Sequence, residues 1–415
     1  MKVADIRLTP VAIPDKPLLN CKGVHQPYAL RTIIEMTCDD GTVGLGESYG
    51  SIKALTGLRE AASSLIGLDP FHLHDLKARV LRALPNGGGI NAKTAVADHK
   101  VTDVVFSAFE IPCMDIQAKT LGRPVSDLLG GAVRGRVPFS AYLFFKFAGH
   151  IGQKPDEWGE VMTPDAMVGQ ARRFVEQYGF QSLKLKGGVL APDVEIETML
   201  KLREAFPHHP LRIDPNGGWT VKTALYIAKK LDGVIEYLED PVLGMEAMAQ
   251  VAHECGIPLA TNMIVLEFGQ IAEAVRKDAV KIILSDHHYW GGLRASTHLA
   301  KLCAVFGLQV SMHSNSHLGI TLAAMTHLAA ATPNLHYACD THYPWTNTDI
   351  IEGGLFQFED GALAVCDKPG LGVSIDQAKL KELAALYESA GMNDRNDTLY
   401  MQQFDPAYER RVPRW

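Results

Sequence analysis

Three short apolar runs that end in charged or amide side chains recur between residues 182 and 240: SLKLK (182–186), LRIDPN (211–216) and IEYLED (235–240). A longer helical run, VEIETMLKLREAF (194–206), separates the first two. Short apolar runs bounded by turn residues are typical of buried strands. Because such strands alternate with a helix, the stretch predicts a parallel sheet with helices packed outside it.

The same strand-and-helix unit repeats on both sides of this stretch. The other predicted strands are FSAYLFF (139–145), PLATN (258–262), KIILSD (281–286), LQVSMHS (308–314) and LHYACD (335–340). Eight strands in about 210 residues fit a TIM-type barrel, which we place at residues 134–360. A doubly wound parallel sheet is the alternative fold.

The flanking segments predict a second, α+β domain. Within residues 1–133, RTIIEMTCDDGTVGLGES (31–48) holds two strand-like runs joined by Asp-Asp-Gly, which is a hairpin signal. Helical patterns follow from Ser51 to Leu129, interrupted by the glycine-rich loop PNGGGINAK (85–93). The segment 361–415 contains one more helical run, QAKLKELAALYESAG (377–391), and we expect it to return to the first domain.

Composition excludes several classes of protein. The chain has 415 residues and a formal net charge of −7, which argues against a nucleic-acid partner. No run approaches the roughly 18 apolar residues of a membrane span, and the N-terminus lacks the features of a signal peptide. The seven cysteines are scattered without a CxxC pair, which favours reduced thiols in a cytoplasmic enzyme.

Polar side chains stand at the end of every predicted barrel strand. They are Tyr142, Lys184, Lys186, Asp214, Glu239, Asn262, Asp286, His313 and Asp340. From Lys186 onward, successive members are 23 to 28 residues apart, which is one strand and one helix each time. The carboxyl ends of barrel strands converge on one mouth, where such folds place their chemistry. The alternative is that each residue only solvates the end of its own strand.

The pair Lys184 and Lys186 lies on one strand with both side chains on the same face. Two neighbouring ammonium groups are expected to lower each other's pKa from the ordinary value of about 10.4. A lysine with a lowered pKa can act as a base. The alternative is a pair of solvated lysines on an edge strand.

Three consecutive strands end in the oxygen donors Asp214, Glu239 and Asn262. Mg²⁺ prefers such donors, and it completes its shell with water or substrate oxygens. Two carboxylates balance the charge of the ion, and the neutral amide leaves room for an anionic substrate. The alternative is that these side chains cap the helices that follow.

The adjacent strand ends Asp286 and His313 predict a second acid–base group. A carboxylate beside an imidazole fixes its tautomer and raises its basicity. His317 lies four residues after His313, and His287 and His288 follow Asp286. A zinc site is therefore an alternative interpretation of this cluster. The chain lacks the HExxH pattern of helical zinc sites, which disfavours it.

Seven ordered motifs carry a family resemblance. They are KLKGGVL, RIDPNGGW, EYLEDP, LATNM, LSDHHYW, MHSNSH and CDTHYPW. In this order and spacing they resemble the enolase superfamily, and within its mandelate racemase-like branch they are most similar to the glucarate dehydratase group. The resemblance extends from about residue 25 to residue 372. It implies a modified TIM barrel of the (β/α)7β type under an α+β capping domain, which the N-terminal region and the C-terminal tail form together.

The resemblance also implies an activity. It is the Mg²⁺-dependent dehydration of D-glucarate, and of L-idarate, to 5-keto-4-deoxyglucarate by α-proton abstraction, an enediolate intermediate and β-elimination of water. The alternatives are an epimerase or racemase, a dehydratase of another sugar acid such as galactarate, a non-catalytic acid-sugar-binding paralogue, and an aldolase that forms a Schiff base on a strand lysine. We expect a homo-oligomer whose partner is a small-molecule aldaric acid.

Site residues follow from the resemblance position by position. Lys186 and His313 match the bases on the two faces of the substrate, with Asp286 beside His313, and Lys184 matches a lysine that contacts the substrate carboxylate. The implied substrate contacts are His25, Thr102, Tyr142, Lys184, Asn216, Asn262, Ser314, Asn315 and His342. Ordinary loop, helix or barrel-lining roles are the alternatives for His25, Thr102 and Tyr142.

The implied metal ligands are Asp214, Glu239 and Asn262. The third ligand is the point of departure from the family, because the stretch EDPVLGMEAMAQ (239–250) is short, and Glu246 is the alternative to Glu239. One of the C-terminal arginines Arg410, Arg411 and Arg414 is expected to reach the site, unless all three belong to a solvated tail.

Overall fold

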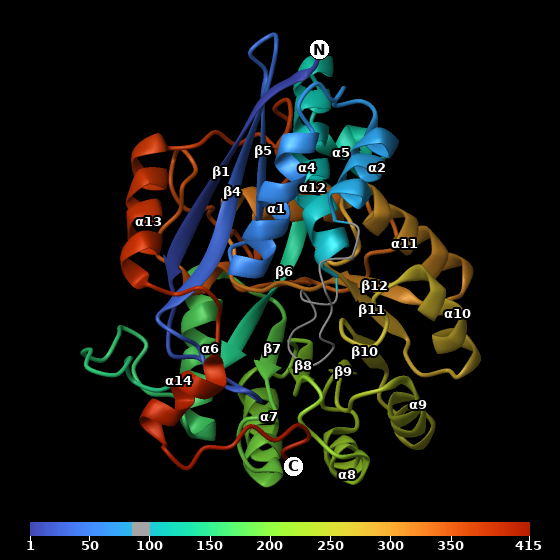
Figure 1. Cartoon of the computed structure of the whole chain (residues 1–415). Helices are drawn as coiled ribbons and strands as arrows, with labels where there is room; N and C mark the ends of the chain where they lie inside the picture. The colour runs from blue at the N-terminus through green and yellow to red at the C-terminus, as the bar shows by residue number, and fades with distance from the viewer. Residues whose placement is uncertain (85–99) are drawn as a thin grey trace.

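A computed structural model describes residues 1–84 and 100–415 (Figure 1). The glycine-rich loop expected at 85–93 therefore lies outside the described residues. All eight predicted barrel strands are present: β6 (Arg136–Phe144), β7 (Leu183–Lys186), β8 (Leu211–Asp214), β9 (Tyr237–Glu239), β10 (Leu259–Thr261), β11 (Ile282–Ser285), β12 (Gln309–Met312) and β13 (Cys339–Thr341). They pair in parallel in the order β12-β11-β10-β9-β8-β7-β6-β13. This confirms the modified TIM barrel and excludes the doubly wound sheet.

The two ends of this curled sheet, β12 and β13, meet without a continuous ladder among the described residues. An isolated bridge joins Val310 to Leu335, and the Ser311 hydroxyl donates a hydrogen bond to the Ala338 carbonyl at 3.0 Å. A further short strand, β14 (Ala362–Ala364), pairs antiparallel with β6. The sheet is closed at this seam mainly by side chains, so the loops that follow β12 and β13 lie next to one another.

A helix follows each of the first seven barrel strands. These helices are α6 (Pro164–Tyr178), α7 (Pro192–Ala205), α8 (Val221–Leu231), α9 (Met245–Glu254), α10 (Phe268–Arg276), α11 (Leu293–Val305) and α12 (Gly319–Ala330). Every residue of α12 is buried, and its sequence, GITLAAMTHLAA, contains no Asp, Glu, Lys or Arg. A helix that is apolar on all sides needs cover on all sides. The N-terminal domain, here called the cap, provides that cover, because its strand β5 (Val43–Tyr49) and its helix α5 (Val125–Leu128) pack against α12.

The cap is built on the predicted hairpin. The strands β1 (Val3–Pro14), β4 (Tyr28–Cys38) and β5 (Val43–Tyr49) form an antiparallel sheet in the order β1-β4-β5. The helices α1 (Ile52–Ser64), α2 (Leu73–Ala83), α4 (Val101–Leu121) and α5 (Val125–Leu128) belong to the same part of the chain, and α4 packs on β5. A small ladder joins β2 (Leu19–Asn20) to β3 (Gly23–Val24).

The C-terminal tail returns to the cap, as the sequence predicts. Helix α13 (Gln377–Ala390) packs on β1 (Figure 1), and helix α14 (Asp397–Phe404) packs on β3. Asn20 Nδ2 donates to Asp397 Oδ2 at 2.8 Å, and Thr398 Oγ1 donates to the Lys22 carbonyl at 2.7 Å. A Cβ at Gly23 would lie 2.4 Å from the Asp397 carbonyl oxygen, so this contact requires glycine. The expected domain boundaries, at residues 133/134 and 360/361, stay predictions.

Two buried carboxylates fasten the cap to the barrel at helix N-termini. Glu47 of β5 accepts hydrogen bonds from the backbone N–H groups of Leu318 (2.8 Å) and Thr321 (2.9 Å) at the start of α12. Glu110 of α4 accepts hydrogen bonds from the N–H groups of Leu293 (2.8 Å) and Arg294 (3.2 Å) at the start of α11. Unpaired N–H groups and the helix dipole favour negative charge at these positions. The barrel mouth is therefore covered in a fixed orientation.

The cysteines and the helix lengths bear on two further expectations from the sequence. All seven cysteines are free, as their scattered spacing predicts. Over residues 1–84 and 100–415, every helix is too short or too polar to cross a membrane.

Candidate active site

The structure brings the two strand lysines together with acids from three other strands. Lys184 Nζ lies 2.5 Å from Asp340 Oδ2, 2.6 Å from Glu239 Oε2 and 3.4 Å from Asp214 Oδ2. Lys186 Nζ donates to Asp214 Oδ2 at 2.6 Å. All these side chains are buried. The edge-strand alternative for the lysines is therefore wrong, since β7 is a central strand with both neighbours paired.

Tyr142 on β6 completes this cluster. Its hydroxyl accepts a hydrogen bond from Lys186 Nζ at 3.0 Å and donates one to Asp214 Oδ2 at 3.3 Å. Lys184 Nζ lies over its ring, 4.7 Å from the centroid. The ring thus orients both lysines at the strand ends.

The expected lowering of the lysine pKa values is wrong in this structure. Burial alone would lower the pKa of Lys184, but attraction to Asp340 and Glu239 outweighs burial and raises that pKa well above its ordinary value. At Lys186, burial is again opposed by a carboxylate, and attraction to Asp214 raises the pKa of that lysine as well. The sequence pattern shows the two like charges on one strand but not the acids that three other strands bring to them.

Glu239 and Asn262 are buried, and each keeps an oxygen without a partner. Glu239 Oε2 meets Lys184 Nζ at 2.6 Å, whereas Glu239 Oε1 and the side-chain carbonyl oxygen of Asn262 lack a hydrogen bond within the described structure. Burial and repulsion from Asp214 raise the pKa of Glu239 well above its ordinary value. Buried polar atoms are almost always paired, and unpaired ones often mark an absent ion. Three oxygen donors on the adjacent strand ends β8, β9 and β10 fit a hard divalent cation such as Mg²⁺.

Local hydrogen bonds hold these donors in place. Asn216, whose φ is 49°, donates from its backbone and its side chain to Asp214 Oδ1, at 3.0 and 2.9 Å. Asp240 Oδ2 accepts a hydrogen bond from the Asn262 backbone N–H at 2.8 Å. Burial raises the pKa of Asp240 to about 7. Asn216 and Asp240 therefore hold the donors at the ends of β8 and β10.

The alternative ligand and the C-terminal arginines lie elsewhere. Glu246 is at the start of α9 with 81% of its side chain exposed, and it pairs with Lys277. Arg411 pairs with Glu409 in solvent. The guanidinium of Arg414 lies over the Tyr408 ring, and Arg410 is exposed. Within the described parts of the chain, no hydrogen bond or ion pair links any of these arginines to the lysine cluster, and the expectation that one of them reaches the site stays a prediction.

The second predicted acid–base group lies at the ends of β11 and β12. His313 Nδ1 is 3.0 Å from Asp286 Oδ2, and the Tyr289 ring stacks beside the imidazole with centroids 6.1 Å apart. Asn315 Nδ2 donates to the Tyr49 hydroxyl of the cap at 2.7 Å. The residues of this group thus come from the barrel, and the cap touches them through Tyr49.

A third cluster joins the cap to the loop after β13. His25 Nδ1 lies 3.0 Å from Asp15 Oδ2, and the rings of His25 and His342 stack with centroids 5.7 Å apart. Ser314 Oγ accepts a hydrogen bond from the His342 backbone N–H at 3.2 Å, across the seam of the sheet. Burial lowers the pKa of His342 to about 3, so the imidazole is neutral at pH 7. Its Nε2 is buried without a partner in the described structure.

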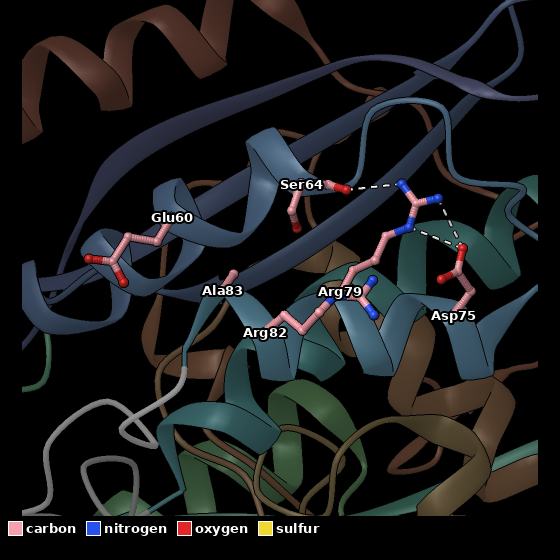
Figure 2. Close-up of a pocket in the computed structure, with 6 residues that line it drawn as sticks. All are labelled: Glu60, Ser64, Asp75, Arg79, Arg82 and Ala83. Atoms are coloured by element: carbon pink, nitrogen blue, oxygen red, sulfur yellow. Dashed lines mark hydrogen bonds and ion pairs between the residues drawn. The ribbon is translucent and has the colours of Figure 1, made fainter.

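Thr102, predicted as a substrate contact, makes no hydrogen bond with the other predicted site residues in the described parts of the chain. It is half-buried in the first turn of α4. A surface pocket of about 400 Å³ between α1 and α2 (Figure 2) also lacks candidate residues. Within it, the Arg79 guanidinium bonds Asp75 and the Ser64 carbonyl, which indicates a structural role.

Several contacts of the site escaped the sequence reasoning. Asp340 is visible as a strand-end acid, but its contact with Lys184 depends on β13 lying beside β6. The pairs Asp15–His25 and Arg31–His288 carry no signal in the sequence, because their members are 10 and 257 residues apart.

Comparisons with known proteins agree with this architecture. Residues 5–130 match the family described as mandelate racemase / muconate lactonizing enzyme, N-terminal domain, and residues 166–379 match the family described as enolase C-terminal domain-like. A protein of Streptomyces coelicolor named probable glucarate dehydratase is 48% identical over 100% of this chain and 99% of its own length.

Solved structures show the same fold. An enolase from Mycobacterium smegmatis, complexed with tartrate, is 52% identical with a TM-score of 0.96 over 100% of this chain and 98% of its own. An enolase from Thermobispora bispora, complexed with magnesium and formate, is 50% identical with a TM-score of 0.97 over 100% of both chains. The chain therefore belongs to the enolase superfamily, to its mandelate racemase-like branch and, within that branch, to the glucarate dehydratase group.

Proposed function

We propose that this enzyme is a Mg²⁺-dependent dehydratase that converts D-glucarate and L-idarate to 5-keto-4-deoxyglucarate. One observation carries the proposal: Glu239 Oε1 and the Asn262 side-chain oxygen are buried without a partner in the described structure, at strand ends that also present two groups able to carry a proton, Lys186 and His313. The S. coelicolor relative named probable glucarate dehydratase supports the substrate class.

The cation would be held by Asp214, Glu239 and Asn262. When bound, Mg²⁺ supplies positive charge beside the substrate carboxylate, which makes the proton on the adjacent α-carbon easier to remove. Lys184 adds an ammonium group at the same place. Because Lys184 is fully buried, its charge acts in a medium of low dielectric constant and stabilises negative charge strongly.

Lys186 and His313 would remove the α-proton from opposite faces. Lys186 holds its own proton tightly as long as no metal ion neutralises Asp214. We therefore expect the basic form of Lys186 to require a bound cation on Asp214. His313 donates Nδ1–H to Asp286, which leaves Nε2 free to take a proton. Where His313 removes the α-proton, it can pass that proton to the departing β-hydroxyl; where Lys186 removes it, His313 has to enter the step protonated at Nε2. Water leaves, and the resulting enol becomes the keto acid.

The cap and the barrel loops would together recognise the distal end of the diacid. The His342 ring lies 5.7 Å from that of His25 in the cap and 6.2 Å from that of Tyr142 on β6, measured between centroids. The barrel residues Asn216, Ser314 and Asn315 would add polar groups. Neutral imidazole and amide N–H groups can donate hydrogen bonds to a carboxylate. Covering the mouth also excludes water from the reacting carbon.

A library of acid sugars, assayed with Mg²⁺ for 2-keto acid products, tests the proposal. We expect D-glucarate and L-idarate to give one common product. Turnover of galactarate alone would instead support a dehydratase of another sugar acid. Solvent-deuterium exchange without keto acid formation would support an epimerase, and the absence of both would contradict catalysis.

A further inference from the structure

Asp286 is shared between two imidazoles, and only one of them belongs to the proposed mechanism. Its Oδ2 lies 3.0 Å from His313 Nδ1, and its Oδ1 lies 3.0 Å from His288 Nδ1. The His288 backbone N–H also donates to Oδ1, at 2.9 Å. Asp286 and His288 are 4% and 3% exposed, so these bonds are made without competition from water.

The other nitrogen of His288 faces a cation from the cap. Arg31 Nη2, on β4, lies 3.2 Å from His288 Nε2, and the same guanidinium donates from Nε to Glu47 Oε1 at 2.9 Å. Arginine is always charged and can only donate hydrogen bonds. His288 Nε2 must therefore accept, and the ring carries its proton on Nδ1.

Two groups lie within hydrogen-bond distance of His288 Nε2. Arg31 Nη2 is 3.2 Å away and can only donate, and the Glu47 carbonyl oxygen is 3.3 Å away and can only accept. The shorter contact assigns Nε2 the role of acceptor. The other charged or titratable groups that face His288 and Arg31 are Asp286, His287, His313, His317, Tyr49 and the Glu47 carboxylate.

We infer that His288 is a positioning residue that, together with Arg31, fixes the tautomer of His313. His288 donates to Asp286 Oδ1 from Nδ1 and from its backbone N–H, and these two hydrogen bonds stabilise the ionised carboxylate. An ionised Asp286 accepts at Oδ2 from His313 Nδ1–H, which leaves the lone pair of His313 on Nε2. The relay runs from the cap through Arg31, His288 and Asp286 to His313.

The energetics of Asp286 agree with this chain of bonds. Burial would raise the pKa of Asp286, but the hydrogen bonds from His288 and His313 outweigh burial and hold that pKa well below its ordinary range. The relay also explains how the position of the cap affects His313 in the barrel. Arg31 Nη2 donates to Thr321 Oγ1 of α12 at 3.3 Å, so a displaced cap would remove the cation from His288.

The test compares His288→Phe with His288→Gln. Phenylalanine fills the space but breaks both bonds, whereas the glutamine amide can accept from Arg31 and donate to Asp286. The first readout is ¹⁵N NMR of the His313 imidazole, assigned by its loss in His313→Asn. We expect the parent and His288→Gln to show the Nδ1–H tautomer, and His288→Phe to show a mixture of tautomers.

The second readout is solvent-deuterium exchange into each epimer of the substrate, and it rests on the proposed function. For the epimer whose exchange His313→Asn abolishes, we expect His288→Phe to slow exchange about 10- to 100-fold, and His288→Gln to stay within about threefold. For the other epimer, which Lys186 serves, the exchange rate should change less than about twofold. This change is much smaller than the 10- to 100-fold slowing expected for the epimer that depends on His313.

Unchanged His313 resonances in His288→Phe would overturn the relay. Equal loss of exchange on both epimers with a parental His313 tautomer would also overturn it, because that pattern indicates a structural role. The NMR comparison needs no substrate. If the parent exchanges neither acid sugar, the proposed function fails, and the resonances of His313 still decide the inference.

Discussion

The ammonium nitrogen of Lys184 lies 2.6 Å from Glu239 Oε2, and both side chains are fully buried. Asp340 and Asp214 also lie within 3.4 Å of this nitrogen, but each has a second cation, Arg212 at 3.6 Å from Asp340 and Lys186 at 2.6 Å from Asp214. A buried carboxylate is costly unless a cation compensates it. Among the described residues, Glu239 is paired with Lys184 alone, which leaves it the acid of this cluster with room for a metal ion.

Glu239→Gln should abolish most of the activity, whereas Glu246→Gln should change it little. Glu239 is a buried oxygen donor, and Glu246 is on the surface of α9. We expect kcat/KM to fall at least about 100-fold in the first variant and less than about twofold in the second. Because the pKa of Glu239 is raised, the metal-free Glu239→Gln protein should melt no lower than the parent. An inactive Glu246→Gln beside an active Glu239→Gln would reverse the assignment.

Removal of divalent metal should stop turnover and lower the melting temperature. EDTA followed by gel filtration should give inactive protein, and Mg²⁺ or Mn²⁺ should restore activity, because the donors are hard oxygens. At a metal concentration about 100 times Kd, binding should stabilise the fold by about 2.7 kcal/mol. The Glu239→Gln variant is the matched control and should show a smaller thermal shift. Full turnover after rigorous chelation would contradict the metal site.

Each base should serve a different epimer. D-glucarate and L-idarate differ only at the carbon that loses its proton, so each presents that proton to a different face. Lys186→Ala should block deuterium exchange into one epimer and spare the other, and His313→Asn should do the reverse while slowing dehydration of both. ¹H NMR in D₂O measures both effects. Exchange retained on the same epimer in both variants would require a single-base mechanism.

The parent should lose stability relative to Glu110→Gln as pH rises from about 4.5 to about 7. Burial raises the pKa of Glu110 from 4.5 to about 7, against the opposing effect of the Leu293 and Arg294 N–H groups. The folded state therefore binds the proton more tightly than the unfolded state, and this contribution is complete below about pH 4.5 and lost by about pH 7. The difference should reach about 3 kcal/mol in urea unfolding compared at about pH 5 and about pH 8. A constant difference between the two proteins would show that Glu110 does not titrate in this range.

Much of the fold was predictable because it is encoded locally. The alternation of short apolar runs with helices located all eight barrel strands, and the polar residue at the end of each run identified the groups that now meet at the mouth. Asp286 and His313 lie 27 residues apart, which is one structural unit, and in a parallel sheet one unit brings strand ends together.

The contacts that were missed depend on docking between distant segments. Arg31 and His288 are separated by 257 residues, and Lys184 and Asp340 by 156. Electrostatics in the interior follow the sum of all such neighbours. The like-charged pair Lys184 and Lys186 therefore led to the wrong direction for both lysine pKa values, since the local sequence contains neither Asp214 nor Asp340.

The loop that carries His25 depends on partners that are made late in synthesis. Asn20 and Lys22 are held by Asp397 and Thr398, which follow them by 377 and 376 residues. A ribosome delivers the chain from its N-terminus, so all eight barrel strands have been synthesised before this loop can be secured. The proposed catalytic strand ends are therefore synthesised before the segment that secures the loop of His25. If His25 selects the substrate, selectivity is the last property of the mouth to be completed during synthesis.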